Sequence, residues 1–311
     1  MIEPVTHANN PASPFDLENE TLYQKWRERK LQDYPQSLGD LLVEIKDPRQ
    51  LTQTEHEALL VRIRKTNMAL YAGKTGENPD RGIPHAISRQ FGVQALDHNW
   101  LSDDDGLTSL TVVKEGIRNQ YIPYSSRAIN WHTDGYYNTL GKQIHTLNLH
   151  CVSPAEKGGE NRIMDHEVAY ILLRDENPDY IQALMAPDAM TLPARIDEGG
   201  TVARPDEPGP VYSIDHSGNL HMRYTIRVHN IIWKDDDITA RAVTLLKELL
   251  ESDSPYIYKG RLEPGMGLIS NNILHDRTAF RDTADHTRLI YRARYYDRLA
   301  NTDIFDIYPD L

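Results

Sequence analysis

The segment NWHTD at residues 130–134 places an imidazole and a carboxylate, both metal-binding groups, two positions apart. On an extended backbone such side chains leave the same face, so His132 and Asp134 can occupy adjacent positions on one metal ion. A third ligand from elsewhere would complete the two-histidine, one-carboxylate set of non-haem Fe(II) oxygenases. With 13 histidines in 311 residues, roughly one His-x-Asp pair arises by chance, so a solvated or turn-making pair is the alternative.

A second candidate segment, LHDRTAF at residues 274–280, supplies His275 after the strand-like run GMGLI. Arg288 follows His275 by thirteen positions, in a run where arginines alternate with apolar residues. Arg288, Arg292 and Arg294 would then share one face of a strand. If this face points inward, the guanidinium groups need anionic partners, and the alternative is a basic strand facing solvent.

Short strands in the C-terminal two thirds of the chain are the elements that must position these residues. Residues 143–152 alternate apolar and polar side chains, as a half-buried strand does, and further β-like runs recur up to residue 296. Helices are expected near the N-terminus, over Asp16–Leu31 and from Thr54 to Gly73, and between the strands over 166–174, 176–185 and 237–252. This pattern predicts a mainly β fold with flanking α-helices, a barrel or a sandwich.

Composition excludes several classes of function. With 39% hydrophobic and 26% charged residues, the sequence is typical of a soluble globular protein. The net charge of −12 argues against nucleic acid or an anionic membrane as a partner. Cys151 is the only cysteine, so a reducing compartment fits. Because we find neither a secretory signal nor an apolar run of about 20 residues, we expect a cytoplasmic protein without membrane contacts.

Four features in order resemble the Fe(II)/2-oxoglutarate-dependent dioxygenases: NWHTD, GGEN at Gly158–Asn161, LHDRTAF and the arginine beyond it. The most similar branch is the taurine dioxygenase-like (TauD/TfdA) group, with γ-butyrobetaine hydroxylase and clavaminate synthase as relatives. The resemblance covers about residues 85–298 and implies a double-stranded β-helix, or jelly roll, with iron at its open end. We expect residues 85–311 to form this oxygenase core and residues 1–84 a helical extension packed on it, within one structural domain.

The resemblance also implies roles for individual residues. His132, Asp134 and His275 would be the catalytic Fe(II) ligands. Arg288 would pair with the distal carboxylate of the cosubstrate 2-oxoglutarate, a planar bidentate match that lysine would not reproduce. Asn161 stands where the family has a threonine, and its amide can donate a hydrogen bond as the hydroxyl does. With O2 as the oxidant, the implied reaction hydroxylates an unactivated C–H bond and releases succinate and CO2.

Four further residues are candidate contacts to a small-molecule substrate. Asn130 precedes the His-x-Asp pair and Tyr136 follows it, so both would lie near iron. Arg227 and Arg292 could bind an anionic group, which favours a small carboxylate, amino acid or sulfonate. The alternative for each arginine is a salt bridge with one of the 46 acidic residues, and for Tyr136 a packing or lid role.

Two other functions remain open from the sequence alone. A cupin-type metalloenzyme would not use 2-oxoglutarate, and Arg288 argues against it. A non-catalytic 2-oxoglutarate- or metal-binding protein on the same fold would have little need of a complete ligand set. The N-terminal helices either cap the barrel or form the interface of a homo-oligomer, and the sequence does not decide between these.

Overall fold

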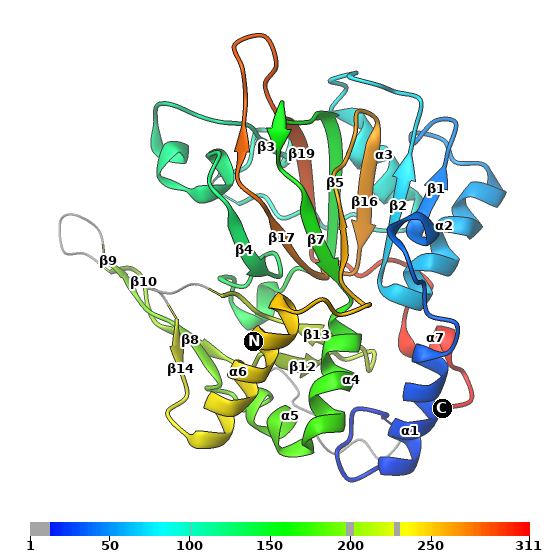
Figure 1. Ribbon diagram of the computed structural model, residues 1–311, viewed down its shortest axis with the longest axis vertical. Helices are drawn as coiled ribbons and strands as arrows, with labels where there is room; N and C mark the ends of the chain where they lie inside the picture. Colours follow the sequence, from blue (N-terminus) through cyan, green and yellow to red (C-terminus); the bar gives the residue numbers. More distant parts are fainter. Residues whose placement is uncertain (1–12, 100, 197–201, 227–230) are drawn as a thin grey trace.

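Two facing β-sheets form the centre of the protein (Figure 1). The computed structural model describes residues 13–99, 101–196, 202–226 and 231–311. In spatial order, the large sheet contains β1 (Leu42–Glu44), β2 (Met68–Ala72), β16 (Met266–Ser270), β5 (Thr146–Ser153), β19 (Leu289–Tyr295) and β3 (Thr108–Leu110). The smaller sheet contains β15 (Tyr258–Gly260), β7 (Asn161–Met164), β17 (Leu274–Arg277) and β4 (Ile129–His132). All strand pairs in these sheets are antiparallel except β1 with β2, which confirms the expected double-stranded β-helix.

Shorter elements surround the two sheets. The other strands are β6 (Lys157–Gly158), β8 (Met190–Leu192), β9 (Arg195–Ile196), β10 (Val202–Arg204), β11 (Glu207–Gly209), β12 (Tyr212–Ile214), β13 (Leu220–Met222), β14 (Ile232–Trp233) and β18 (Phe280–Arg281). The α-helices are α1 (Glu20–Leu31), α2 (Gln53–Thr66), α3 (Gly82–Gln90), α4 (His166–Glu176), α5 (Pro178–Leu184), α6 (Asp237–Glu251) and α7 (Ile304–Ile307). Short 3-10 helices are Leu38–Leu41, Ile117–Gln120, Ile122–Tyr124 and Leu140–Lys142.

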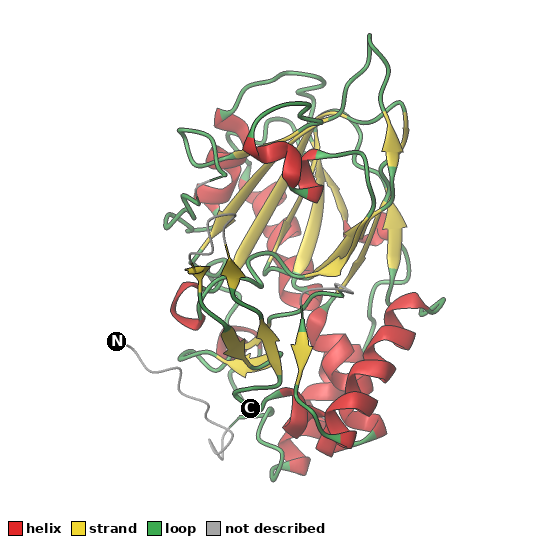
Figure 2. Cartoon of the chain, turned by 90° about the vertical axis from the view of Figure 1, so that its left-hand side faces the viewer, coloured by secondary structure: helices red, strands yellow, loops and turns green. Residues whose placement is uncertain are grey.

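Helices lie on the outer face of the large sheet and at one end of the barrel (Figure 2). The helices α2 and α3 contribute to an apolar cluster with β2, β16 and β19 on the outer face. The helices α4, α5 and α6 pack together below the sheets, which confirms the three expected internal helices. The first turn of α6 is held by Asp236, whose carboxylate accepts a 2.7 Å hydrogen bond from the backbone N–H of Thr239.

The strand β5 differs from the half-buried strand expected from its alternation. Leu149 faces the interior of the barrel, but the polar side chains of its other face are also buried. There Asn148 donates to the Ser88 hydroxyl of α3, and His150 hydrogen-bonds to the Tyr71 hydroxyl of β2. Both faces of β5 are therefore covered, and each of these two buried polar side chains forms one hydrogen bond.

The N-terminal 84 residues contribute more than the expected helical extension. The predicted helix from Thr54 to Gly73 is wrong at its C-terminal end, because α2 stops at Thr66 and Asn67 adopts a left-handed conformation with φ 59°. The next five residues form β2, which pairs with β16 inside the large sheet. A short apolar run such as MALYA fits a buried strand as well as the end of a buried helix, so periodicity could not separate the two.

A buried ion-pair cluster attaches α1 to the barrel. Lys30 Nζ lies 2.8 Å from Asp165 Oδ2 and 2.5 Å from Glu167 Oε2, with the three side chains at most 10% exposed. Lys30→Met leaves both carboxylates buried without a cation, so we expect a loss of roughly 3–5 kcal/mol in the free energy of unfolding, measured by denaturant titration. Lys25→Met removes the exposed pair with Asp310 and should change it by less than about 1 kcal/mol. Equal losses in the two variants would contradict this prediction.

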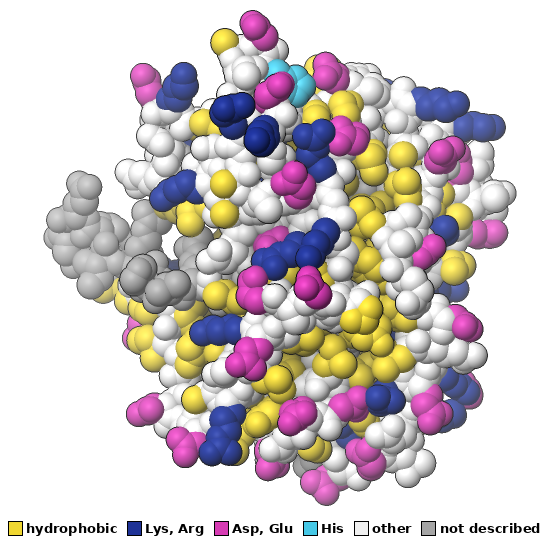
Figure 3. All heavy atoms as spheres, viewed as in Figure 1, with side chains coloured by type: hydrophobic (Ala, Val, Ile, Leu, Met, Phe, Trp, Pro, Cys, Tyr) yellow, Lys and Arg dark blue, Asp and Glu magenta, His cyan; other side chains and the backbone are white. Residues whose placement is uncertain are grey.

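The surface mixes charges of both signs. On the face shown in Figure 3, acidic and basic side chains are interspersed and no basic stripe runs across the view. A nucleic-acid-binding face would gather lysine and arginine on one surface. Among the helices that the structure describes, we find none with the length and apolar character needed to cross a membrane.

Candidate active site

The two histidines of the predicted metal site lie opposite each other on neighbouring strands. His132 on β4 is paired with His275 on β17, and their ring centroids are 4.2 Å apart. Asp134 follows the end of β4, and its Oδ2 lies 3.8 Å from His275 Nε2. One ligand atom from each of the three side chains lies within 4.8 Å of the others. Segments more than 140 positions apart in the sequence therefore meet in a group with the dimensions of a metal site.

Backbone carbonyls fix the orientation of both imidazoles. His132 Nδ1 lies 2.9 Å from the carbonyl oxygen of Asn130, and His275 Nδ1 lies 3.0 Å from that of Ile273. A carbonyl only accepts, so each Nδ1 carries the hydrogen and each Nε2 keeps a lone pair for a metal. Burial, together with the neighbouring His275, lowers the pKa of His132 to about 3, so this ring is neutral at neutral pH.

Asp134 uses its two carboxylate oxygens differently. Its Oδ1 accepts hydrogen bonds from Arg292 Nη1 at 2.9 Å and from Arg294 Nη1 at 3.4 Å. Its Oδ2 is buried, faces His275 and accepts no hydrogen bond from any described residue. Burial alone would raise the pKa of Asp134, but Arg292 and then Arg294 hold it well below its ordinary value. The donor set of two imidazoles and one ionised carboxylate oxygen without a partner among the described residues fits Fe(II).

Asn272 holds the backbone of Asp134, and the sequence analysis missed it. Its Oδ1 accepts from the Asp134 N–H at 2.8 Å, and its Nδ2 donates to the Asp134 carbonyl at 2.9 Å. Asn272 is in a left-handed conformation with φ 50°, which asparagine tolerates better than most residues. The Asn-Asn pair that precedes the strand of His275 was the available signal for such a turn.

Arg294 is the second missed contact to Asp134. It was noted only for its alternation along β19, but its side chain is 2% exposed and its guanidinium also bonds to Asp97 Oδ2 and to the Tyr137 hydroxyl. Its charge therefore has a partner besides Asp134. No local pattern joins Asp97 to β19, so the contact could be found only from the fold.

Arg288 and Asn161 lie on neighbouring parts of the barrel. Arg288, just before β19, is 6% exposed, and its Nη1 donates to the Leu110 carbonyl at 3.4 Å. Asn161 begins β7 and donates from Nδ2 to the Asp276 carbonyl at 2.5 Å. The turn that precedes Asn161 requires glycine. Gly158 has φ 80°, and a Cβ at this position would meet the Ala279 carbonyl oxygen at 2.3 Å.

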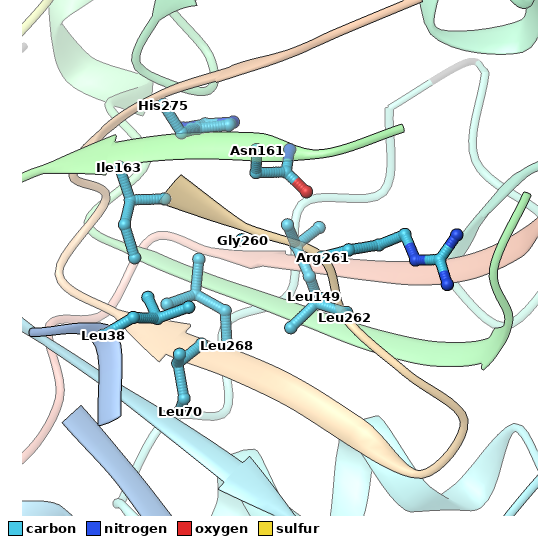
Figure 4. A pocket seen from close by; sticks show the side chains of 10 residues that line it. All are labelled: Leu38, Leu70, Leu149, Asn161, Ile163, Gly260, Arg261, Leu262, Leu268 and His275. Atoms are coloured by element: carbon cyan, nitrogen blue, oxygen red, sulfur yellow. The ribbon is translucent and has the colours of Figure 1, made fainter. Parts of the chain in front are cut away.

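A narrow, mainly apolar cavity of about 30 Å³ lies between the sheets next to the metal site. His275 and Asn161 line one side of it, and leucine side chains of the large sheet line the other (Figure 4). Its apolar lining between the sheets comes from Leu70, Leu149, Ile163 and Leu268. The cavity thus connects one metal-site histidine to the residue that stands in the threonine position of the family.

Three of the four predicted substrate contacts lie close to the triad. The Tyr136 ring centroid is 6.4 Å from that of His132. Asn130 is exposed, with its amide donating to the Ile226 carbonyl at 3.2 Å. Arg292 does form the salt bridge considered from the sequence, but its partner is Asp134 itself. Arg227 lies outside the described residues.

Solved structures with this fold include iron oxygenases. The non-heme iron oxygenase OrfP, solved with Fe and alpha-ketoglutaric acid, matches 88% of the chain and 90% of its own length at a TM-score of 0.58 and 16% identity. AAD-2 with Mn(II) and N-oxalylglycine matches 84% and 97% at 0.57 and 12%. An asparagine oxygenase solved with Fe(II), 2S,3S-3-hydroxyasparagine and succinate matches 78% and 81% at 0.53 and 15%. These likenesses establish the jelly-roll oxygenase fold.

The sequence itself places the chain in a family. Residues 49–294 match the family described as "Taurine catabolism dioxygenase TauD, TfdA family". The chain therefore belongs to the TauD/TfdA family of Fe(II)/2-oxoglutarate-dependent dioxygenases, and the resemblance noted in the sequence is confirmed. This membership argues against the cupin-type alternative.

Two curated relatives of this chain are both named uridine-5'-phosphate dioxygenase. A uridine-5'-phosphate dioxygenase of Amycolatopsis sp is 33% identical over 178 residues, 53% of this chain and 60% of the relative. A uridine-5'-phosphate dioxygenase of Streptomyces sp is 32% identical over 83 residues, 27% of this chain and 30% of the relative. The matched regions thus span less than two thirds of either relative.

Proposed function

We propose that this oxygenase hydroxylates a C–H bond of a small anionic molecule and releases succinate and CO2. The observation that carries the proposal is the convergence of His132, Asp134 and His275, with ligand atoms within 4.8 Å of one another. Bound iron and 2-oxoglutarate would supply the oxidising power, since decarboxylation of the 2-oxo acid accompanies the reduction of O2. The carboxylate of Asp134 favours hydroxylation, because related halogenases have a small residue there to admit chloride.

The protein would orient the cosubstrate and keep water away. Arg288 would take the distal carboxylate, with Asn161 as a second donor. The apolar cavity beside His275 suits the methylene groups of the cosubstrate. We infer that 2-oxoglutarate would meet the metal at its 2-oxo acid end and Arg288 at its distal carboxylate, with Asn161 and His275 both lining the apolar cavity.

For the substrate we infer a nucleoside 5'-monophosphate, with uridine 5'-phosphate as the first candidate. Arg292 supports an anionic group, because its Nε is buried and has no hydrogen-bond partner in the part of the chain that the structure describes. The name of the two relatives supports the nucleotide.

An oxygen-uptake and succinate-release screen tests this function. The protein would receive Fe(II), ascorbate, 2-oxoglutarate and one compound from a panel of nucleotides, amino acids, betaines and sulfonates. We expect uridine 5'-phosphate to stimulate both oxygen uptake and succinate release. Stimulation by a sulfonate or an amino acid alone would overturn the nucleotide assignment. Binding of 2-oxoglutarate without oxygen uptake for any compound would overturn the catalytic proposal and favour a non-catalytic binding protein.

Arg292→Gln should weaken substrate binding with little effect on the cosubstrate. Loss of a charge-assisted hydrogen bond costs about 1.5–3 kcal/mol, so we expect the KM of the anionic substrate to rise roughly 10- to 100-fold. Arg294 still holds Asp134 in this variant, so the 2-oxoglutarate dissociation constant should change by less than about threefold. Arg49→Gln, which removes exposed ion pairs with Asp47 and Asp80, is the control. An unchanged KM in Arg292→Gln would show that Arg292 only supports Asp134.

A further inference from the structure

A second arginine near the metal site has buried N–H groups without a hydrogen-bond partner in the described ranges of the chain. Arg277 ends β17 two residues after His275, and the pairing of β17 with β4 shifts register between the two residues. It is 3% exposed, and its Nη2 donates to the carbonyls of Ser125 at 2.9 Å and Arg127 at 2.5 Å. Its Nε and Nη1 are buried and meet no acceptor among the described residues. Buried donors of a charged group rarely stay unsatisfied, because their desolvation is costly.

Arg277 and Arg288 share one neighbour, the ring of Phe280. The guanidinium carbon of Arg277 lies 4.7 Å from the ring centroid, and that of Arg288 lies 5.2 Å from it. Neither arginine forms a salt bridge with an acidic residue in the part of the chain described. Asp282 interacts electrostatically with both guanidinium groups but forms a salt bridge with neither. Two cations are thus buried around one aromatic ring without a paired anion.

A negative charge added near Arg277 and Arg288 would stabilise these two buried cations. Burial lowers the pKa of Arg288 to about 10, and Arg277 brings a second buried cation to the same aromatic ring. Cys151 cannot compensate, because burial raises its thiol pKa to about 12 and keeps it protonated. An anionic ligand between these groups would restore the missing interactions.

The turn at Gly158 and Gly159 packs directly against the segment that carries Arg277. The Gly159 N–H donates to the Thr278 hydroxyl and to the Ala279 carbonyl. A Cβ on Gly159 would lie 3.8 Å from Arg288 Nε. The residues that follow His275 therefore lead from the metal site to the place where Arg288 is buried. This places Arg277 on the cosubstrate side of the barrel, whereas Arg292 and Arg294 contact Asp134.

We propose that Arg277 is a second cosubstrate-binding arginine, which donates from Nε or Nη1 to the distal carboxylate of 2-oxoglutarate beside Arg288. The proposal rests on the proposed function, because it requires 2-oxoglutarate to bind here. Two guanidinium groups at one end of the pocket select a dicarboxylic 2-oxo acid over a monocarboxylic one. Any acid without the distal carboxylate leaves both cations unpaired.

Binding of two acids that differ only at this end tests the proposal. The Fe(II)-loaded protein without oxygen would be titrated with 2-oxoglutarate and with 2-oxopentanoate, which lacks the distal carboxylate, and followed by charge-transfer absorption. For Arg277→Met we expect the 2-oxoglutarate dissociation constant to rise roughly 10- to 100-fold. That of 2-oxopentanoate should stay within about twofold, because the lost donor has no partner on this acid. N-oxalylglycine with Mn(II), followed calorimetrically, should weaken as 2-oxoglutarate does.

Arg174→Met is the matched control, since Arg174 is equally buried and donates to the carbonyls of Pro14 and Asp16 near α1. It should lower stability without changing the ratio of the two dissociation constants. An unchanged ratio in Arg277→Met would overturn the proposal and leave Arg277 as a structural residue. If Arg277→Met does not fold, the ratio in Arg277→Lys and Arg277→Gln decides. Wild-type protein that binds no 2-oxoglutarate would instead overturn the proposed function.

Discussion

His275→Ala is expected to abolish succinate release and to weaken Fe(II) binding by more than roughly 100-fold. Replacing only an outer-shell partner of a metal ligand costs about 10- to 100-fold in affinity or activity, and this variant removes a ligand itself. It leaves His132 Nε2 and Asp134 Oδ2 as the only two of the three proposed ligand atoms, and two protein ligands hold iron poorly. Metal content after gel filtration without oxygen, measured by mass spectrometry, checks the prediction independently of turnover.

His150→Ala separates loss of the metal from damage to the fold. His150 is buried on β5, hydrogen-bonded to the Tyr71 hydroxyl on the outer face of the large sheet. Its loss should lower thermal stability but leave the iron content unchanged. Retention of stoichiometric iron by His275→Ala would remove the basis for the assigned triad. Equal loss of iron in both variants would mean that unfolding, and not ligation, controls metal binding.

The sequence was enough to predict that His132, Asp134 and His275 converge, because they lie in short segments whose local geometry is simple. His132 and Asp134 bracket the end of one strand, and His275 follows another strand at a recognisable distance from Arg288. Motif order then implied a jelly roll, and the fold brings these segments together through the pairing of β4 with β17. The convergence of these three side chains depends only on their local sequence and on one strand pairing.

Contacts between side chains of distant segments were beyond sequence reasoning. That Arg292 pairs with Asp134, or that Asn272 holds the Asp134 backbone, depends on how β19 and the loops that follow β4 and β16 pack together. The position of β2 was missed for a related reason. The left-handed turn at Asn67 ends α2, but the run that follows fits either a helix or a strand until β16 lies beside it. Tertiary pairing, and not local preference, decides such cases.

The second large effect is expected for Arg288, which would bind the distal carboxylate of 2-oxoglutarate. Arg288→Met should raise the dissociation constant of 2-oxoglutarate by about 100-fold or more, because a bidentate guanidinium–carboxylate pair contributes two charge-assisted hydrogen bonds. Arg288→Lys should recover only part of this loss, since an ammonium group keeps the charge but not the planar fork. Titration of the Fe(II)-loaded protein without oxygen measures both. The metal content should stay at the wild-type level, because Arg288 contacts none of the three ligands in the structure.

Comparison of Arg288→Met with Arg288→Lys shows whether Arg288 acts through the planar geometry of its guanidinium group or through its charge alone. If Arg288→Lys binds 2-oxoglutarate as wild type does, charge alone fixes the cosubstrate, and the geometric argument for arginine fails. If Arg288→Met binds as wild type does, the distal carboxylate lies elsewhere, and the placement of the cosubstrate between His275 and Arg288 is wrong. Arg288→Met should also weaken 2-oxopentanoate by much less than 2-oxoglutarate, since the monocarboxylic acid presents nothing to this guanidinium. Equal weakening of both acids would instead indicate that loss of Arg288 disturbs the pocket as a whole, since its side chain packs against Phe280.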